Sequence, residues 1–381
     1  MNFFEKIFRF GIIAIGLIVE VIIVRNLFLF FTEHFVWIEM VLRLFSILLV
    51  MYIINNSRHL SADILWVLLI ILFPIPGTAL FLLLGANLIT SKTFLELIKN
   101  TVESKKYFVQ DEIVLEEMEE IAPHMKGDFY YLSKTEGYPI YRNSNFDYYA
   151  LSDLGYPVML EEMKKAESFI FLEYFTIEKG KLWECMHTIL KEKVAQGLDV
   201  RVMYDDMGTI HSLPPNYANM LESEGIKCVR YNKINPFLGV VMNHRDHRKI
   251  MVIDGKVAFS GGMNLADEYI NQKMVFGHWK DNVIRVKGEA VWSYTVLFLA
   301  NWNAIRKTDD DYTVFKVDAK MENTDGYISP YGETPFDGEN TGQNVYMNIL
   351  NRANNYVYLH TISDYRYRIR ECFNLSRKAW C

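Results

Sequence analysis

The sequence predicts an α/β protein in which a mixed-sheet body follows an apolar, transmembrane N-terminal region. Two observations lead to this fold class. Ten of the first 90 residues are charged, against 76 of the following 291, so the apolar residues are concentrated at the N-terminus. From Tyr138 onward, short β-branched and aromatic runs alternate with amphipathic helical patterns, which is typical of strands and helices that share one domain.

The overall composition excludes several classes of protein. Apolar and aromatic residues make up 51% of the chain, and the net charge is only −6. A disordered chain would need lower hydrophobicity, and a dedicated nucleic-acid binder is usually basic. The cysteines are too few and too scattered for a disulfide framework or a zinc site, which favours a reducing compartment. They are Cys185, Cys228, Cys372 and Cys381.

The clearest candidate for a membrane span is the stretch 64–86, which contains no charged residue. Its 23 residues, at about 1.5 Å each, are enough to cross a hydrocarbon core of roughly 30 Å. Pro74, Pro76 and Gly77 are expected to kink this stretch or to divide it into two half-helices.

Two further apolar stretches precede it. In the stretch 35–55, Glu39 and Arg43 lie one helical turn apart and can form an ion pair or extend to the interface. The stretch 10–31 carries Glu20 and Arg25 well inside, where a lone charge costs roughly 2.5–3.5 kcal/mol.

We therefore expect two or three spans at the N-terminus. A cleaved signal peptide fits less well, because no small-residue cleavage site follows the first stretch. Burial of three long apolar stretches in a soluble domain is the remaining alternative. Cations on the two sides are about equal in number, so they leave the orientation open.

The body begins with a polar, helix-favouring segment, and its acidic run at 116–120 is interpreted as a solvated helix face. Several elements follow from the patterns. We expect strands at 169–177, 199–206 and 226–231, helices at 182–197, 216–225 and 289–305, the last one amphipathic, and a hairpin at 249–262 that turns at Asp254–Gly255.

An internal similarity suggests a duplicated unit. Residues 163–174 and 350–361 align at an offset of 187, and each copy reads as the end of a helix that leads into a buried strand. The polar segment 307–344 reads as a long connecting loop. The predicted organisation is a transmembrane region at 1–90, a helical linker at 91–135, a first repeat at 136–306, and an inter-repeat loop with an incomplete second repeat at 307–381.

The candidate chemistry lies in a His-x-Lys-x4-Asp motif formed by His247, Lys249 and Asp254. Residues two apart on a strand point to one face, so the first two side chains are expected to share a site. A neutral imidazole can attack a phosphodiester, and a neighbouring ammonium can neutralise the phosphate oxygens. Asp254 lies at the predicted turn and is expected to support the site.

Gly261, Gly262 and Asn264 follow the motif. The glycines permit close approach of the backbone, and the asparagine can donate to phosphate or orient a partner. Three fixed residues match by chance in a few per cent of chains of this length, and a His-Lys pair on a strand is more often surface decoration. The strand–turn–strand context favours a site. No ligand spacing for a metal is present.

With these residues in view, the chain resembles the phospholipase D superfamily and, within it, the bacterial cardiolipin synthases. The resemblance extends over about residues 1–360. It is carried by the motif, by Gly-Gly-x-Asn at 261–264, and by Trp66 with the Pro-x-Pro-Gly segment. It also rests on five stretches: 169–183, 200–210, 243–271, 276–282 and 327–337.

The resemblance implies a phospholipase D-like sandwich lobe, here with a second lobe only begun. It implies an enzyme of the bacterial cell membrane, with a cytoplasmic body, that joins two phosphatidylglycerol molecules to give cardiolipin and glycerol. One histidine forms a phosphatidyl-enzyme, and a second one moves protons. No metal, nucleotide or nucleic acid takes part. By this resemblance His247 is one of the two histidines, Lys249 binds phosphate, Asp254 is the third motif residue, and Asn264 is the supporting asparagine.

The chain departs from this pattern because it holds one such motif. His124-x-Lys126 and His278-x-Lys280 have Tyr131 and Arg285 where the aspartate belongs. The offset of 187 places a second histidine near position 434, beyond Cys381.

From about residue 362 onward the sequence is unlike the family, so we expect a truncation or a shifted reading frame. A one-motif phosphodiesterase that acts as a homodimer and an inactive membrane protein are the alternatives.

Overall fold

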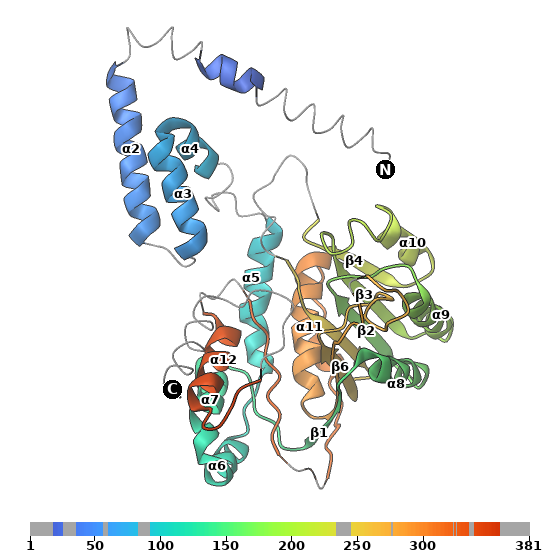
Figure 1. Cartoon of the computed structure of the whole chain (residues 1–381). Helices are drawn as coiled ribbons and strands as arrows, with labels where there is room; N and C mark the ends of the chain where they lie inside the picture. The colour runs from blue at the N-terminus through green and yellow to red at the C-terminus, as the bar shows by residue number, and fades with distance from the viewer. Residues whose placement is uncertain are drawn as a thin grey trace. The chain divides into compact units, whose positions relative to one another are not determined.

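A computed structural model describes residues 18–25, 36–55, 60–82, 92–233, 245–275, 277–322, 324, 326–334 and 339–358. The chain divides into two compact units, Met1–Ile89 and Thr90–Cys381. Figure 1 shows both units, coloured along the chain.

The second unit is built on a seven-stranded sheet of order β1-β7-β6-β5-β2-β3-β4. Strands β2, β3 and β4 run parallel, whereas β1, β7, β6 and β5 pair antiparallel, so the sheet is mixed as the sequence predicted. The strands are β1 Ser144–Tyr149, β2 Phe169–Tyr174, β3 Asp199–Asp205, β4 Lys227–Tyr231, β5 Lys249–Ile253, β6 Val257–Gly261 and β7 Val283–Gly288.

Helices cover both faces of this sheet (Figure 1). They include α8 Ser152–Lys164, α9 Lys181–Ala195 and α10 Tyr217–Ser223 on one face, and α11 Val291–Arg306 with α5 Lys92–Ser104 on the other. Further segments of the unit are η2 Lys105–Tyr107, α6 Glu112–Ile121, η3 Pro123–Met125, α7 Lys126–Tyr130, η4 Tyr131–Thr135, η6 Tyr312–Phe315 and α12 Thr341–Arg352.

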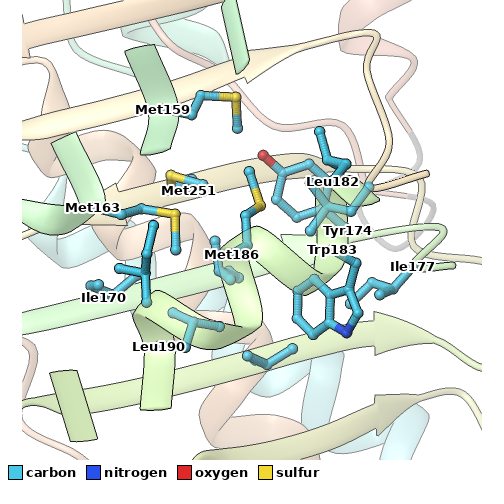
Figure 2. Close-up of a cluster of buried hydrophobic side chains, with 14 of the residues drawn as sticks. Met159, Met163, Ile170, Tyr174, Ile177, Leu182, Trp183, Met186, Leu190 and Met251 are labelled. Carbon is cyan, nitrogen blue, oxygen red and sulfur yellow. The ribbon is translucent and has the colours of Figure 1, made fainter. Parts of the chain in front are cut away.

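All six residues of β2 are buried because both faces of the strand are covered. Ile170 and Tyr174 face a core shared with α8 and α9, which is rich in methionine and contains Trp183 (Figure 2). Phe169 and Phe171 face a second core, where Phe171 stacks on Phe298 of α11 at 4.7 Å between ring centroids. Full burial of one such side chain stabilises the fold by about 1.5–3 kcal/mol.

The prediction of an amphipathic helix at 289–305 was right about the helix and wrong about its polar face. Twelve of the sixteen residues of α11 are buried, among them Asn301 and Asn303. The physical reason is that α11 lies between the sheet and α5, so neither side faces water.

The predicted hairpin forms as expected. Asp254 and Gly255 both have positive φ, 54° and 64°, which is the conformation of a two-residue turn that suits twisted strands. The amide N–H of Lys256 donates to the carbonyl of Ile253 at 3.0 Å and closes the turn.

The first unit contains α2 Val36–Asn55, α3 Leu60–Leu72 and α4 Pro74–Leu80, as well as helical residues at 18–25. The predicted ion pair is present, with Arg43 Nη2 2.7 Å from Glu39 Oε1. Within the described ranges, no helix combines the length and apolar character needed to cross a bilayer. The expected spans at 35–55 and 64–86 are therefore not supported, and Pro74 divides the second of them. The stretch 10–31 lies mostly outside the described residues.

Of the strand predicted for the second repeat, the structure describes only residues 356–358, so the second repeat stays a prediction. Helix α12 ends at Arg352, and 356–358 pair with no strand. Tyr356 and Tyr358 are 73% and 89% exposed, although the sequence similarity predicted burial. The segment from 359 onward lies outside the described residues.

Candidate active site

The candidate site lies at the edge of the sheet where several strands begin or end. Tyr174, the last residue of β2, is paired with Lys249, the first residue of β5. Strand β3 ends beside them at Asp205, because β2 and β3 are parallel. Gly261 ends β6 opposite Val283, which begins β7. This convergence brings segments from four parts of the chain to one place.

The structure brings His247 and Lys249 together, as the sequence predicted. His247 precedes β5 and remains exposed, whereas Lys249 is buried. The Lys249 ammonium donates to the backbone carbonyl of His247 at 2.8 Å. Both side chains contact the ring of Phe175, which lies 4.9 Å from the imidazole centroid and 5.6 Å from Lys249 Nζ.

The surroundings favour a neutral imidazole beside a cation. Although His247 keeps access to solvent, desolvation by the surrounding protein atoms lowers the pKa of its imidazole below the ordinary value of 6.5. The charge of Lys249 adds to this effect, while that of Asp246 opposes it. Burial lowers the pKa of Lys249 to about 8, against the opposing charges of Asp246 and Asp281. At neutral pH the imidazole therefore has a free lone pair, while most of the lysine remains charged.

Asp254 is not part of this site. It lies in the turn at the far end of β5, and its carboxylate accepts hydrogen bonds from three consecutive backbone N–H groups. Glu167, Ser168 and Phe169 donate at 2.8, 2.7 and 2.9 Å. The carboxylate anchors the entry to β2, since three donors hold it there, and the role of Asp254 in the chemistry stays a prediction.

Asn264, Gly261 and Gly262 lie at and after the end of β6, where they shape one side of the candidate site. Asn264 is 3% exposed, accepts from the Thr176 N–H at 3.1 Å, and donates to the Tyr269 hydroxyl at 2.7 Å. These bonds hold Asn264 between the backbone of Thr176 and the hydroxyl of Tyr269, and both of its predicted roles stay predictions. A Cβ on Gly262 would lie 1.7 Å from Oδ1 of Asp281, and one on Gly261 would lie 2.4 Å from the Asn282 carbonyl. The glycines permit this close approach.

Three buried acidic side chains near the backbone of His247 form a network that the sequence did not predict. They are Asp205, Asp246 and Glu173. Asp205, fully buried, accepts from the N–H of Asp246 through Oδ2 at 3.0 Å and from the N–H groups of Met207 and Gly208 through Oδ1. Asp246 in turn accepts from the N–H of Arg248 at 3.1 Å. These bonds fix the backbone on both sides of His247.

Glu173 completes this network from β2. Its Oε1 accepts from Asn301 at 2.7 Å, while its Oε2 and Oδ2 of Asp246 have no hydrogen-bond partner among the described residues. Burial raises the pKa of Glu173 well above its ordinary value, and the charge of Asp246 raises it further, against the attraction of Arg248. A protonated Glu173 can donate to Asp246. The one local feature of the sequence that could have indicated this network is the acidic residue Glu173 within the otherwise apolar and aromatic strand β2.

The described residues contain no group of three or more His, Cys, Asp or Glu side chains arranged to hold a metal ion. The predicted absence of a metal and of other cofactors stays a prediction.

Comparisons with known proteins agree with the interpretation of the motif. The family model described as "Cardiolipin synthase, PLD-like domain" matches residues 159–291, which include His247 and Lys249. An uncharacterized protein of Streptococcus mutans is 41% identical over 314 residues, covering 82% of this chain and 68% of that protein.

The chain belongs to the cardiolipin synthase family of the phospholipase D superfamily. Cardiolipin synthases of Alkalihalophilus pseudofirmus and Oceanobacillus iheyensis are 28% and 30% identical to it. These matches cover 80% and 78% of this chain, and the chain spans 61% and 62% of those two relatives.

Proposed function

We propose that this family member is a phosphatidyltransferase that converts two phosphatidylglycerol molecules into cardiolipin and glycerol. The observation that carries the proposal is the pairing of His247 with Lys249 on the ring of Phe175. The relatives named cardiolipin synthases supply the substrate class.

In the proposed first step, a His247 ring nitrogen attacks the phosphorus of phosphatidylglycerol. A P–N bond forms while the P–O bond to the glycerol headgroup breaks, and the leaving glycerol takes a proton from the second histidine that the family resemblance implies. In the second step, the hydroxyl of another phosphatidylglycerol gives its proton back to the second histidine and attacks the phosphorus, and the P–N bond breaks so that the imidazole of His247 is released. Lys249 neutralises the charge that builds up on the phosphate oxygens in both steps.

The test uses the full chain in detergent with phosphatidylglycerol. We expect cardiolipin and glycerol in equal amounts, and we expect their loss in His247→Ala. His124→Ala is the matched control, because His124 is exposed and also begins a His-x-Lys pair. The proposal fails if no cardiolipin forms at any protein concentration, or if His247→Ala remains active.

A homodimer with a shared site is the second candidate, and the observation that favours it is the single motif in the sequence. Each copy would supply one histidine. In the dilute range, the rate of such an enzyme rises with the square of the protein concentration. Hydrolysis of simple phosphodiesters without lipid transfer would favour this one-motif phosphodiesterase over the synthase.

We also propose that the protein works at the bacterial cell membrane with its second unit on the cytoplasmic side. Support comes from the first unit, where Val41, Leu65 and Ile71 are at least 60% exposed. Exposed apolar surface costs about 25 cal/mol per Å² in water, whereas lipid removes this cost. The lipid partners would be phosphatidylglycerol and cardiolipin. Recovery of the chain in the soluble fraction would contradict this location.

A further inference from the structure

The uncharged stretch of the first unit turns back on itself. Helix α3 ends at Leu72, and the Phe73 N–H donates to the carbonyl of Leu69 at 2.9 Å. Phe73 has φ −133° and ψ 75°, which interrupts the helix before Pro74 starts α4. A proline suits the first position of a helix because no N–H is needed there.

Two contacts show that α4 folds back beside α3. The rings of Trp66 and Phe81 lie 5.5 Å apart between centroids, although 15 residues of continuous helix would rise about 22 Å. A Cβ on Gly77 would lie 2.6 Å from the carbonyl oxygen of Leu69. The glycine therefore permits backbone contact between the two arms of the hairpin.

The hairpin buries its polar groups against α2. Ser46 Oγ lies 2.9 Å from the carbonyl oxygen of Pro74 and 2.8 Å from Thr78 Oγ1, and both side chains are less than 10% exposed. Its outer surface is apolar: Leu65, Leu68 and Leu72 are 69%, 49% and 68% exposed. A hydrocarbon environment requires that polar groups be hydrogen-bonded inside the protein and that the outer surface be apolar, and this hairpin has both features.

We propose that α3 and α4 form a re-entrant hairpin that enters the hydrocarbon region of a phospholipid bilayer and leaves it on the side from which it entered. This inference rests on the membrane location proposed above. The 13 residues of α3 rise about 20 Å, which is less than the roughly 30 Å of the hydrocarbon core. Arg58 and Lys92, which flank the apolar stretch, then lie on one side, where anionic headgroups attract them.

The test measures which side of the membrane each end of the hairpin occupies. Ser57→Cys and Ser91→Cys are placed singly in the full chain after Cys185→Ser, Cys228→Ala, Cys372→Ser and Cys381→Ser. Sealed right-side-out and inverted vesicles are then treated with a membrane-impermeant maleimide. The cysteine-free parent gives the background, and a variant that retains only the exposed Cys185 reports the side of the second unit.

We expect both introduced cysteines to react in the same vesicle orientation. Reaction in opposite orientations would show a spanning segment and overturn the hairpin. Release of the chain by carbonate, or its recovery as a soluble oligomer, would overturn the lipid environment itself. Cardiolipin formation is measured on the same samples, so loss of activity with unchanged labelling contradicts only the proposed reaction.

A second variant tests the cause of the reversal. Replacing Pro74, Pro76 and Gly77 together by alanine leaves one uninterrupted apolar stretch of helix-forming residues. We expect the two labelled positions to move to opposite sides of the membrane. If both still reacted from one side, the turn at Phe73–Pro74 would not be what returns the chain, and the proposal would fail.

Discussion

Lys249 and Asp254 lie at opposite ends of strand β5, although both belong to one sequence motif. Five residues at about 3.3 Å each separate their backbones by roughly 16 Å. Lys249 contacts His247 and Phe175, whereas Asp254 holds the backbone that enters β2. The motif thus combines a reactive end with an anchoring end, joined by a buried strand.

Replacing Asp254 by alanine should destabilise the protein before it affects the chemistry. Three backbone N–H groups lose their acceptor, so we expect the free energy of unfolding to fall by about 3 kcal/mol in chemical denaturation. Asp111→Ala is the control, because this exposed cap accepts a single N–H bond and should cost about 1 kcal/mol. Lost activity at unchanged stability would instead place Asp254 in the reaction.

The pH profile of kcat/KM should be bell-shaped. Activity should rise as His247 loses its proton below pH 6.5, since its pKa is lowered, and should fall near pH 8 as Lys249 becomes neutral. Lys249→Arg should abolish the alkaline limb, because a guanidinium stays charged, while lowering the maximal rate. An alkaline limb that persists in the arginine variant would assign it to another group.

Glu173→Gln should change how stability depends on pH. The folded-state pKa of Glu173 is raised above its unfolded value, so folding keeps a proton that the unfolded chain releases as pH rises. Wild-type stability should therefore decline above about pH 4.5 relative to the glutamine variant, by at most about 1.4 kcal/mol per pH unit.

Chemical denaturation of both proteins from pH 5 to pH 8 measures this difference. Glu173→Ala is the control and should be less stable throughout, because the Asn301 amide loses its acceptor. Parallel pH dependences of the glutamine variant and the wild type would show that Glu173 is ionised in the folded protein.

Gly262→Ala should impair the site through Asp281. The added Cβ would lie 1.7 Å from Oδ1 of Asp281, so this carboxylate, whose charge raises the pKa of Lys249, must shift. We expect kcat/KM to fall about 100-fold and the alkaline limb to move to lower pH, because Lys249 loses a stabilising charge. Gly127→Ala is the control, since its Cβ would meet only the flexible end of Arg352. An unchanged alkaline limb would show that the charge of Asp281 does not affect the pKa of Lys249.

Much of the fold could be predicted because its signals are local. The buried strand at 169–174, the helix that ends before Gly197, and the turn at Asp254–Gly255 follow from short patterns of apolar residues and glycine. Strands β1 and β7 were not identified. Most residues of β1 are exposed, and buried and half-buried residues alternate irregularly in β7, so each segment by itself resembles a loop. Only their antiparallel pairing identifies them as strands.

By itself, the sequence determined that His247 and Lys249 would share a site, because residues two apart near a strand reach the same face. It also determined that Pro74 would interrupt the uncharged stretch, because proline cannot continue the helix before it. Only the tertiary structure decided that this stretch folds back, that Asp254 is an anchor, and that Asp205, Glu173 and Asp246 meet behind His247. These outcomes depend on contacts between residues that are distant in the sequence, and no local pattern encodes such contacts. Burial in a shared core then determines the protonation of these acidic side chains and the groups to which they bond.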